Sequence, residues 1–280
     1  MLERMRAYSL NDVHATRKRK DSWWTVYMVD PVACRLTLLV ANHTDITPNG
    51  LTRLSLVLGM GSAVCFAFGQ LVAGAALFYV SFVVDCMDGK IARLKETGTA
   101  FGLWLDYVGD RIRVVCCAIG LAIGQYAATG DDAYIMLGAG VAVLDLFRYV
   151  NAPQMKRVRE VVKENRLESR ANAGPVVPRQ PRPPGMPRPP RPPRVLTVRR
   201  RLGRFLIRHR VRTHLISGIE FHAAVFVVAP LVGVAALLPV SIVAGTLLLL
   251  NEVFLIYRMW LFTRAVPPVP RPENAQRVPA

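Results

Sequence analysis

Four aspartates interrupt an otherwise apolar stretch of this 280-residue chain, at Asp85, Asp88, Asp106 and Asp110. A charged carboxylate costs about 2.5–3.5 kcal/mol at the centre of a membrane helix, so four together need a compensating cation or water. The first two are spaced i,i+3 and the last two i,i+4, so each pair projects from one face of a helix. The spacing predicts two acidic helix faces that can share one site.

Binding of a hard divalent cation is the chemistry that four carboxylates favour. Mg²⁺ and Mn²⁺ take oxygen ligands and are often shared with substrate phosphates. The set contains no histidine or cysteine, which argues against zinc. Bound metal would also remove the mutual repulsion of the carboxylates. We therefore expect a site for Mg²⁺ or Mn²⁺ that holds two ions.

The composition indicates that these acids lie in a membrane. Hydrophobic residues make up 52% of the chain and are concentrated in 51–150 and 213–263, with charge before, between and after these stretches. Because about 20 apolar residues cross a bilayer, the chain is predicted to be an all-α integral membrane protein with six transmembrane helices. These spans are expected near 50–69, 71–93, 102–125, 132–150, 214–236 and 239–263.

The sequence before the first span has two parts. Residues 1–30 are polar and basic, and we expect them to be poorly ordered. Residues 31–43 have the pattern of an amphipathic helix that lies on the membrane interface. No apolar stretch followed by a cleavage site is present at the start, so a cleaved signal peptide is not expected. The membrane domain is therefore predicted over 31–263.

The net charge of +17 is concentrated in one insert, 154–212, with 18 lysines and arginines against three glutamates. Short basic loops stay on the cytoplasmic side and attract anionic lipid, so this position argues against nucleic-acid binding. With six spans, both termini and the acidic site would face the cytoplasm. Ten prolines in 175–194 exclude a helix there and predict a spacer or docking peptide. A proline-rich tail, 264–280, ends the chain.

The expected topology brings the two acidic pairs to similar depths. The second span ends near Arg93 and the third begins near Gly102. Asp85 and Asp110 each lie eight residues from these ends, or roughly 12 Å inside at about 1.5 Å per residue. The other two aspartates are shallower. An antiparallel helix pair would thus bring all four carboxylates together.

The aspartates belong to a longer pattern, Asp85-x2-Asp88-Gly89-x2-Ala92-Arg93-x8-Gly102-x3-Asp106-x3-Asp110. This pattern resembles the signature of the CDP-alcohol phosphotransferase family at all eight of its positions. The likeness extends to the six-span layout and the preceding interfacial helix, over about 31–263. The Pro/Arg-rich insert is not something the family pattern requires.

The resemblance implies a phospholipid-synthesis enzyme that transfers a phosphatidyl group from CDP-diacylglycerol, or another CDP-alcohol, to an alcohol with release of CMP. All four aspartates would be metal ligands, and Asp110 would also take the proton from the acceptor hydroxyl. The residues that would border the CDP donor are Asp88, Gly89, Ala92, Arg93, Gly102 and Asp106.

Three arginines could bind a phosphate on the acceptor, namely Arg113, Arg148 and Arg258. An acceptor such as inositol phosphate or glycerol phosphate would require such residues. The alternative for each arginine is that it extends to the membrane interface and binds no substrate. The acceptor is therefore expected to be a phosphorylated polyol, whose identity the sequence leaves open.

Two other functions compete with the enzyme. A transporter also uses intramembrane carboxylates, but it would distribute them across the membrane depth. A non-enzymatic anchor that presents the Pro/Arg-rich segment to a partner leaves the four acids unexplained. Separately, Gly120 and Gly124 form a GxxxG motif in the third span, which indicates close helix packing or the face of a homodimer.

Overall fold

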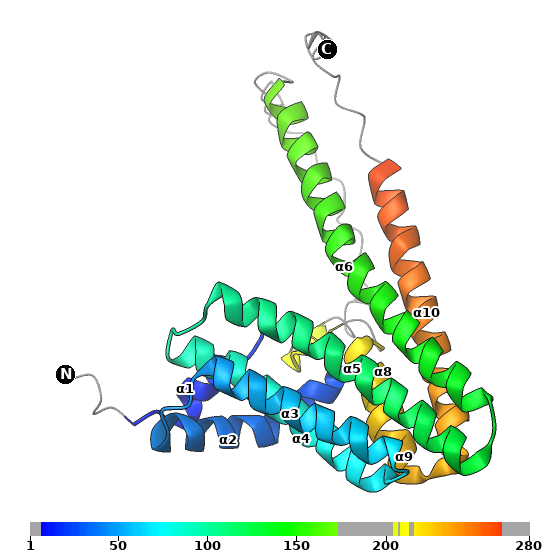
Figure 1. The fold of residues 1–280 in the computed structure, drawn as a ribbon. Coiled ribbons are helices and arrows are strands. Elements are labelled where there is room, and N and C mark those ends of the chain that lie inside the picture. Colours follow the sequence, from blue (N-terminus) through cyan, green and yellow to red (C-terminus); the bar gives the residue numbers. More distant parts are fainter. Residues whose placement is uncertain (1–6, 173–203, 207, 213–215, 265–280) are drawn as a thin grey trace, which may run out of the picture.

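The computed structural model describes residues 7–172, 204–206, 208–212 and 216–264, and these residues form a helical protein (Figure 1). Their β-structure is limited to one isolated bridge between Asp21 and Val211. Five helices are long and apolar enough to cross a membrane, so the chain is a multi-pass membrane protein. The proline-rich segment 175–194 and the tail after 264 lie outside the described residues.

Helices α4 (Leu71–Leu94) and α5 (Ala100–Thr129) carry the acidic motif, and α3 (Pro48–Ala67) packs on both of them. The sequence sets their starts. Thr47 accepts a hydrogen bond from the Gly50 amide at the start of α3, and Thr99 does the same for Gly102 at the start of α5. These boundaries lie within a few residues of the predicted first three spans.

The fourth and sixth spans are longer than predicted. Helix α6 runs from Ala133 to Asn172 and so continues through the first part of the basic insert, where Lys156 and Glu160 form an i,i+4 ion pair at 3.8 Å. Helix α10 covers Val234–Arg264. Figure 1 shows α6 and α10 running side by side away from the α3–α5 bundle.

The predicted fifth span is a shorter, irregular apolar helix. It consists of α8 (Gly218–Ala223), a π-helical turn η3 (Ala224–Val228) and α9 (Ala229–Val232). Gly233, with φ of 121°, ends it before α10 begins. The segment nevertheless belongs to the core, because Phe226 stacks against Phe78 of α4 with ring centroids 4.8 Å apart.

The N-terminal segment is folded, so the expectation of poor order is wrong for residues 7–30. It contains α1 (Leu10–Ala15) and a π-helical turn η2 (Thr25–Val29), which leads into α2 (Asp30–His43) at the place of the predicted interfacial helix. The Ser9–Asp12 capping box explains why a helix starts in so polar a sequence. Helix α2 packs on α4, which brings this segment close to the acidic motif.

The two glycines of the GxxxG motif allow α5 to approach α3 closely within one chain. A Cβ atom at Gly120 would lie 2.2 Å from the carbonyl oxygen of Ala63, and one at Gly124 would lie 2.0 Å from that of Phe66. Backbone atoms cannot yield at such distances without separating the helices. This glycine face is therefore already occupied by α3, and the close-packing interpretation of the motif is confirmed.

We expect Gly124→Ala to lower the melting temperature of the purified protein, because the added methyl group overpacks the α3–α5 contact by about 1–3 kcal/mol. Gly140→Ala on α6 is the matched control, since a Cβ there meets no atom within 4 Å. Alanine in place of glycine favours an exposed helix by up to about 1 kcal/mol. Thermal unfolding in detergent checks the contrast, and equal melting temperatures for both variants would contradict the close contact.

Candidate metal and active site

Three of the four motif aspartates converge in the structure. Asp85 and Asp88 on α4 and Asp106 on α5 each present a carboxylate oxygen, and the three oxygens all lie within 4.8 Å of one another. Three hard oxygen donors at this spacing fit a divalent cation such as Mg²⁺ or Mn²⁺. The predicted convergence is thus confirmed for these three, and the cluster could hold a metal ion.

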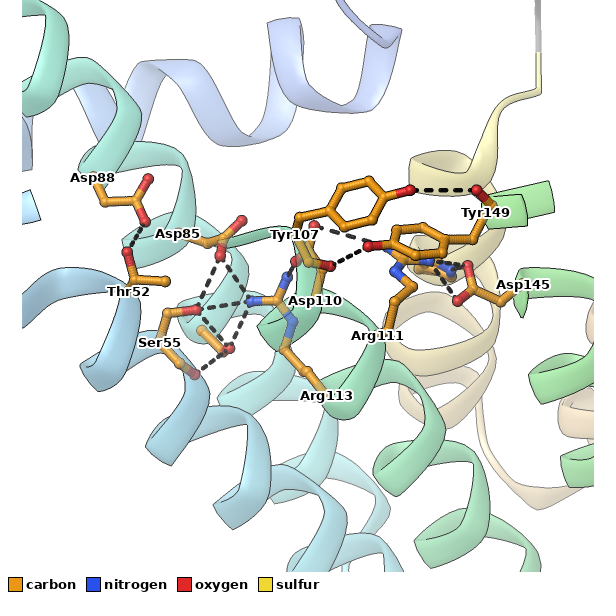
Figure 2. A network of polar contacts seen from close by, with 12 residues as sticks. Thr52, Ser55, Asp85, Asp88, Tyr107, Asp110, Arg111, Arg113, Asp145 and Tyr149 are labelled. Carbon is orange, nitrogen blue, oxygen red and sulfur yellow. Dashed lines mark hydrogen bonds and ion pairs between the residues drawn. The ribbon is translucent and has the colours of Figure 1, made fainter. Parts of the chain in front are cut away.

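Helix α3 supplies hydroxyl groups to the acids on α4. Thr52 donates a hydrogen bond to Oδ2 of Asp88, and Ser55 donates one to Oδ1 of Asp85 at 3.3 Å (Figure 2). Such contacts orient metal-binding carboxylates. The sequence interpretation did not include these two residues. The sequence pattern that could have identified them is a stripe of small or polar residues at helical spacing on α3, namely Thr52, Ser55, Gly59 and Ser62.

The fourth aspartate, Asp110, is joined to the cluster through Arg113. One nitrogen of this guanidinium, Nη2, donates to Oδ1 of Asp110, and the other, Nη1, lies 3.4 Å from Oδ1 of Asp85. Nη1 also donates to Ser55 at 2.8 Å and to Ser81 at 3.2 Å. Arg113 is only 3% exposed, so it neutralises buried negative charge between the two acidic pairs (Figure 2).

The acids open into a cavity of about 310 Å³. A smaller cavity of about 80 Å³ shares part of its wall. All six residues predicted to border the donor line one or both of them, and these are Asp88, Gly89, Ala92, Arg93, Gly102 and Asp106. The sequence motif is therefore gathered around two adjoining cavities, as a donor site requires.

A second polar cluster forms the opposite end of the site. Arg111 Nη1 donates to both carboxylate oxygens of Asp145 at 2.5 Å, and His222 Nε2 lies 2.8 Å from Oδ1 of the same side chain. The Arg111 guanidinium also lies 4.7 Å from the ring centre of Tyr149. His222 also lines the larger cavity. The role of Arg111 was missed from the sequence because this residue is not part of the motif (Figure 2).

The three arginines proposed for the acceptor lie in different surroundings. Arg113 and Arg148 both line the larger cavity, but the guanidinium of Arg113 faces the acids and serines already described. Arg148 Nε is 3.5 Å from Oε1 of Glu252 on α10. Arg258 is exposed on α10 and lies outside both cavities. The structure thus brings Arg148 to the cavity and leaves Arg258 apart from it.

Comparison with known proteins identifies the family of this motif. Residues 45–169 match the family model of the CDP-alcohol phosphatidyltransferases. An archaetidylinositol phosphate synthase of Methanothermobacter thermautotrophicus is 32% identical over 98 residues, which is 35% of this chain and 46% of that protein. A CDP-diacylglycerol–serine O-phosphatidyltransferase of Helicobacter pylori is 32% identical over 116 residues, or 41% of this chain and 46% of that protein.

A crystal structure of the phosphatidylinositol phosphate synthase of Mycobacterium tuberculosis with CDP-DAG bound superimposes with a TM-score of 0.43 and 21% identity, over 88% of this chain and 98% of that chain. The chain spans less than half the length of the two curated relatives that it matches. The family-model match over residues 45–169 includes the helices that carry the eight-residue motif. Through residues 45–169, this chain is similar to the CDP-alcohol phosphatidyltransferases.

Proposed function

We propose that this protein transfers a phosphatidyl group from a CDP-linked donor, CDP-diacylglycerol, to the hydroxyl group of a polar alcohol, with release of CMP. The observation that supports the proposal most is the cluster of three carboxylates, whose oxygens lie within 4.8 Å of one another at the wall of a cavity of about 310 Å³. The two relatives, an archaetidylinositol phosphate synthase and a CDP-diacylglycerol–serine O-phosphatidyltransferase, agree with this proposal.

The acids would hold divalent metal, which would supply positive charge to the phosphates of the donor. In our proposal Asp85, Asp88 and Asp106 form the core of the ligand set, and Asp110 completes it for a second ion. Gly89 and its neighbours leave space for the donor beside these acids.

Asp110 is also the proposed base. Its Oδ1 accepts from Arg113, whereas its Oδ2 has a longer ion-pair contact of 3.8 Å with Arg111. Oδ2 would take the proton of the acceptor hydroxyl, and the hydroxyl oxygen would attack the β-phosphorus of the donor. The bond from this phosphorus to the CMP oxygen then breaks, and CMP leaves with the electron pair.

The acceptor we propose is a phosphorylated polyol, such as inositol phosphate or glycerol phosphate. The support is the surplus of positive side chains around the larger cavity, among them Arg111 and Arg148. Arginine binds phosphate with paired hydrogen bonds. The match to an archaetidylinositol phosphate synthase agrees with this preference. The match to a CDP-diacylglycerol–serine O-phosphatidyltransferase makes serine the acceptor to compare with it.

We further propose that six segments cross the membrane, with the helix Gly218–Val232 as the fifth, and that the site and both termini face the cytoplasm. The support is that Phe221, Val225 and Phe226 of this helix lie in the main core with residues of the long apolar helices. The basic insert, which joins α6 to this helix, favours the cytoplasmic side. Helix α2 would then lie on the cytoplasmic interface.

Product analysis tests the reaction directly. Purified protein is incubated with CDP-diacylglycerol, Mg²⁺ and a panel of inositol phosphate, glycerol phosphate, inositol and serine, and CMP and the lipid product are identified by mass. We expect CMP only when an alcohol is present, and the largest yield with a phosphorylated polyol. A transporter or a non-enzymatic anchor would release no CMP under any of these conditions.

Removal of metal is expected to stop the reaction. Treatment with EDTA should reduce CMP release to background, and added Mg²⁺ or Mn²⁺ should restore it, because both ions take the oxygen ligands that the carboxylates offer. The same samples, checked by thermal unfolding, control for loss of the fold. CMP release that persists after complete chelation would contradict a metal-dependent site.

A further inference from the structure

The N-terminal segment forms one side of the larger cavity. Five residues between 16 and 25 line it together with the motif residues, namely Arg17, Lys18, Asp21, Trp24 and Thr25. We call residues 16–25 the N-terminal wall. Residues 45–169, which match the family, do not include it. The motif on α4 and α5 therefore accounts for only part of the surface that a substrate would meet.

Hydrogen bonds to its backbone hold the N-terminal wall over the site. Arg93, a motif residue, donates from Nε to the carbonyl oxygen of Thr16 at 2.7 Å. Arg210 donates from Nε and Nη2 to the carbonyl oxygen of Lys18, at 3.1 and 2.7 Å. The Asp21 amide donates to the carbonyl oxygen of Arg210 at 2.8 Å. The wall is thus fixed from α4 on one side and from the end of the basic insert on the other.

Arg210 is itself held by a buried ion pair. Its Nη1 lies 3.3 Å from Oδ2 of Asp30, and Lys90 of α4 lies 2.9 Å from Oδ1 of the same carboxylate. Asp30 and Lys90 are both only 4% exposed. Arg210 also adopts a φ of 61°, a backbone conformation that costs about 1–3 kcal/mol in a non-glycine residue and persists only where its surroundings enforce it. This arrangement fixes the position of Arg210 relative to the catalytic helix α4.

The wall presents a lysine side chain to the acidic cluster. The carbonyl oxygen of Lys18 is bound by Arg210, and the residue lines the same cavity as Asp85, Asp88 and Asp106. An ammonium group offers three donors and a compact charge, which suits a phosphate oxygen. Lys18 and the adjacent Arg19 and Lys20 are all exposed, but of these three only Lys18 is among the residues that line the cavity.

We infer that Lys18 is a substrate-binding residue that contacts a phosphate group of the substrate, and that Arg210 positions it by holding the N-terminal wall. This inference rests on the proposed function of the cavity. The phosphate is that of a phosphorylated acceptor or the diphosphate of the CDP donor. Both present the same anionic oxygens, and kinetics can separate them.

Substitution of Lys18 tests the inference with controls from the same stretch. Because a hydrogen bond to a charged group contributes about 1.5–3 kcal/mol, Lys18→Gln should raise a KM by about tenfold or more. Arg19→Gln and Lys20→Gln, which change the net charge equally, should leave KM unchanged. A rise in KM for the phosphorylated acceptor alone would show that Lys18 contacts the acceptor phosphate. A rise in KM for CDP-diacylglycerol would show that Lys18 contacts the diphosphate of the donor. Unchanged KM values for both substrates would overturn the inference.

A binding measurement separates this result from failure of the proposed reaction. Calorimetry with Mg²⁺ and inorganic pyrophosphate, on the full chain in detergent, should show weaker binding for Lys18→Gln than for wild type and for Lys20→Gln. If wild type released no CMP from any CDP-linked donor, the proposed function would fail, and this measurement alone would decide the role of Lys18. Equal binding by all three proteins would then overturn it.

The positioning role of Arg210 has its own test. Arg210→Gln should raise the same KM as Lys18→Gln. The double variant should show no further increase, because both substitutions remove the same contact between Lys18 and the substrate. Arg210→Lys, which retains the charge but has fewer donors, should recover part of the lost affinity. Additive KM increases would show that Arg210 acts independently of Lys18 and would overturn the positioning role. A lower melting temperature with unchanged KM would show that Arg210 only stabilises the fold.

Discussion

Asp110→Asn is expected to lower the rate of CMP release by about 10²–10⁴-fold, the usual contribution of a positioned general base. Asparagine keeps the shape of the side chain and can still meet Arg113, but it cannot take a proton from the acceptor hydroxyl. The fold should survive, since Arg113 keeps its contacts with Ser55 and Ser81. The loss should therefore appear in kcat, with little change in the melting temperature.

Binding of Mn²⁺, followed by electron paramagnetic resonance, gives a second measurement for this variant. Asp110 does not belong to the group of three carboxylates within 4.8 Å of one another, so Asp110→Asn should retain one tightly bound ion and lose a weaker one. Asp132→Asn, at an exposed position next to the start of α6, is the control and should behave as wild type. Near-normal kcat in Asp110→Asn would show that another group accepts the proton.

Asp88→Asn should be as damaging and should act through the metal. Asp88 is 7% exposed and contributes one of the three clustered oxygens, so its loss removes a ligand that no solvent-exposed neighbour can replace. Because a bound metal stabilises charge in the transition state by several kcal/mol, we expect CMP release to fall by at least about 10³-fold. Mn²⁺ binding should fall with it, in contrast to Asp110→Asn.

Thr52→Val provides a graded comparison for this variant. Valine has nearly the same shape as threonine but cannot donate a hydrogen bond to Oδ2 of Asp88. Loss of a group that orients a ligand costs about 10–100-fold in metal affinity or activity, so the effect should be clearly smaller than that of Asp88→Asn. An Asp88→Asn enzyme with wild-type affinity for Mn²⁺ would show that the metal lies elsewhere.

The helices of the site could be predicted closely because their signals are local. Thr47 and Pro48 start α3, and Gly130, with φ of 68°, ends α5. The end of α6 could not be predicted in the same way. Its last turns, up to Asn172, are charged rather than apolar, so a search for membrane-crossing length stops near residue 150. The irregularity of the fifth helix was not predicted, because a π-helical turn at Ala224–Val228 leaves no distinct pattern in an apolar sequence.

The acidic site was predictable to the level of helix faces and depth, but not to the level of side-chain partners. Helical spacing and the antiparallel order of α4 and α5 explain why Asp85, Asp88 and Asp106 meet. That Asp110 is linked through Arg113 depends on side-chain rotamers. That Lys18 reaches the cavity depends on contacts between residues about 190 positions apart, such as Arg210 with the carbonyl oxygen of Lys18. The i,i+3 spacing of Asp110 and Arg113 permits the first contact, but the second has no signal in local sequence.

The 40 residues of α6 correspond to about 60 Å of helix, roughly twice the thickness of a hydrocarbon core. Even at a 40° tilt, the upper end of the range for membrane helices, it would extend about 46 Å along the bilayer normal. Its outer part is paired with α10, where Arg166 lies 4.5 Å from the ring centre of Phe262. The two helices thus form a paired stalk that is longer than the crossing of a hydrocarbon core requires.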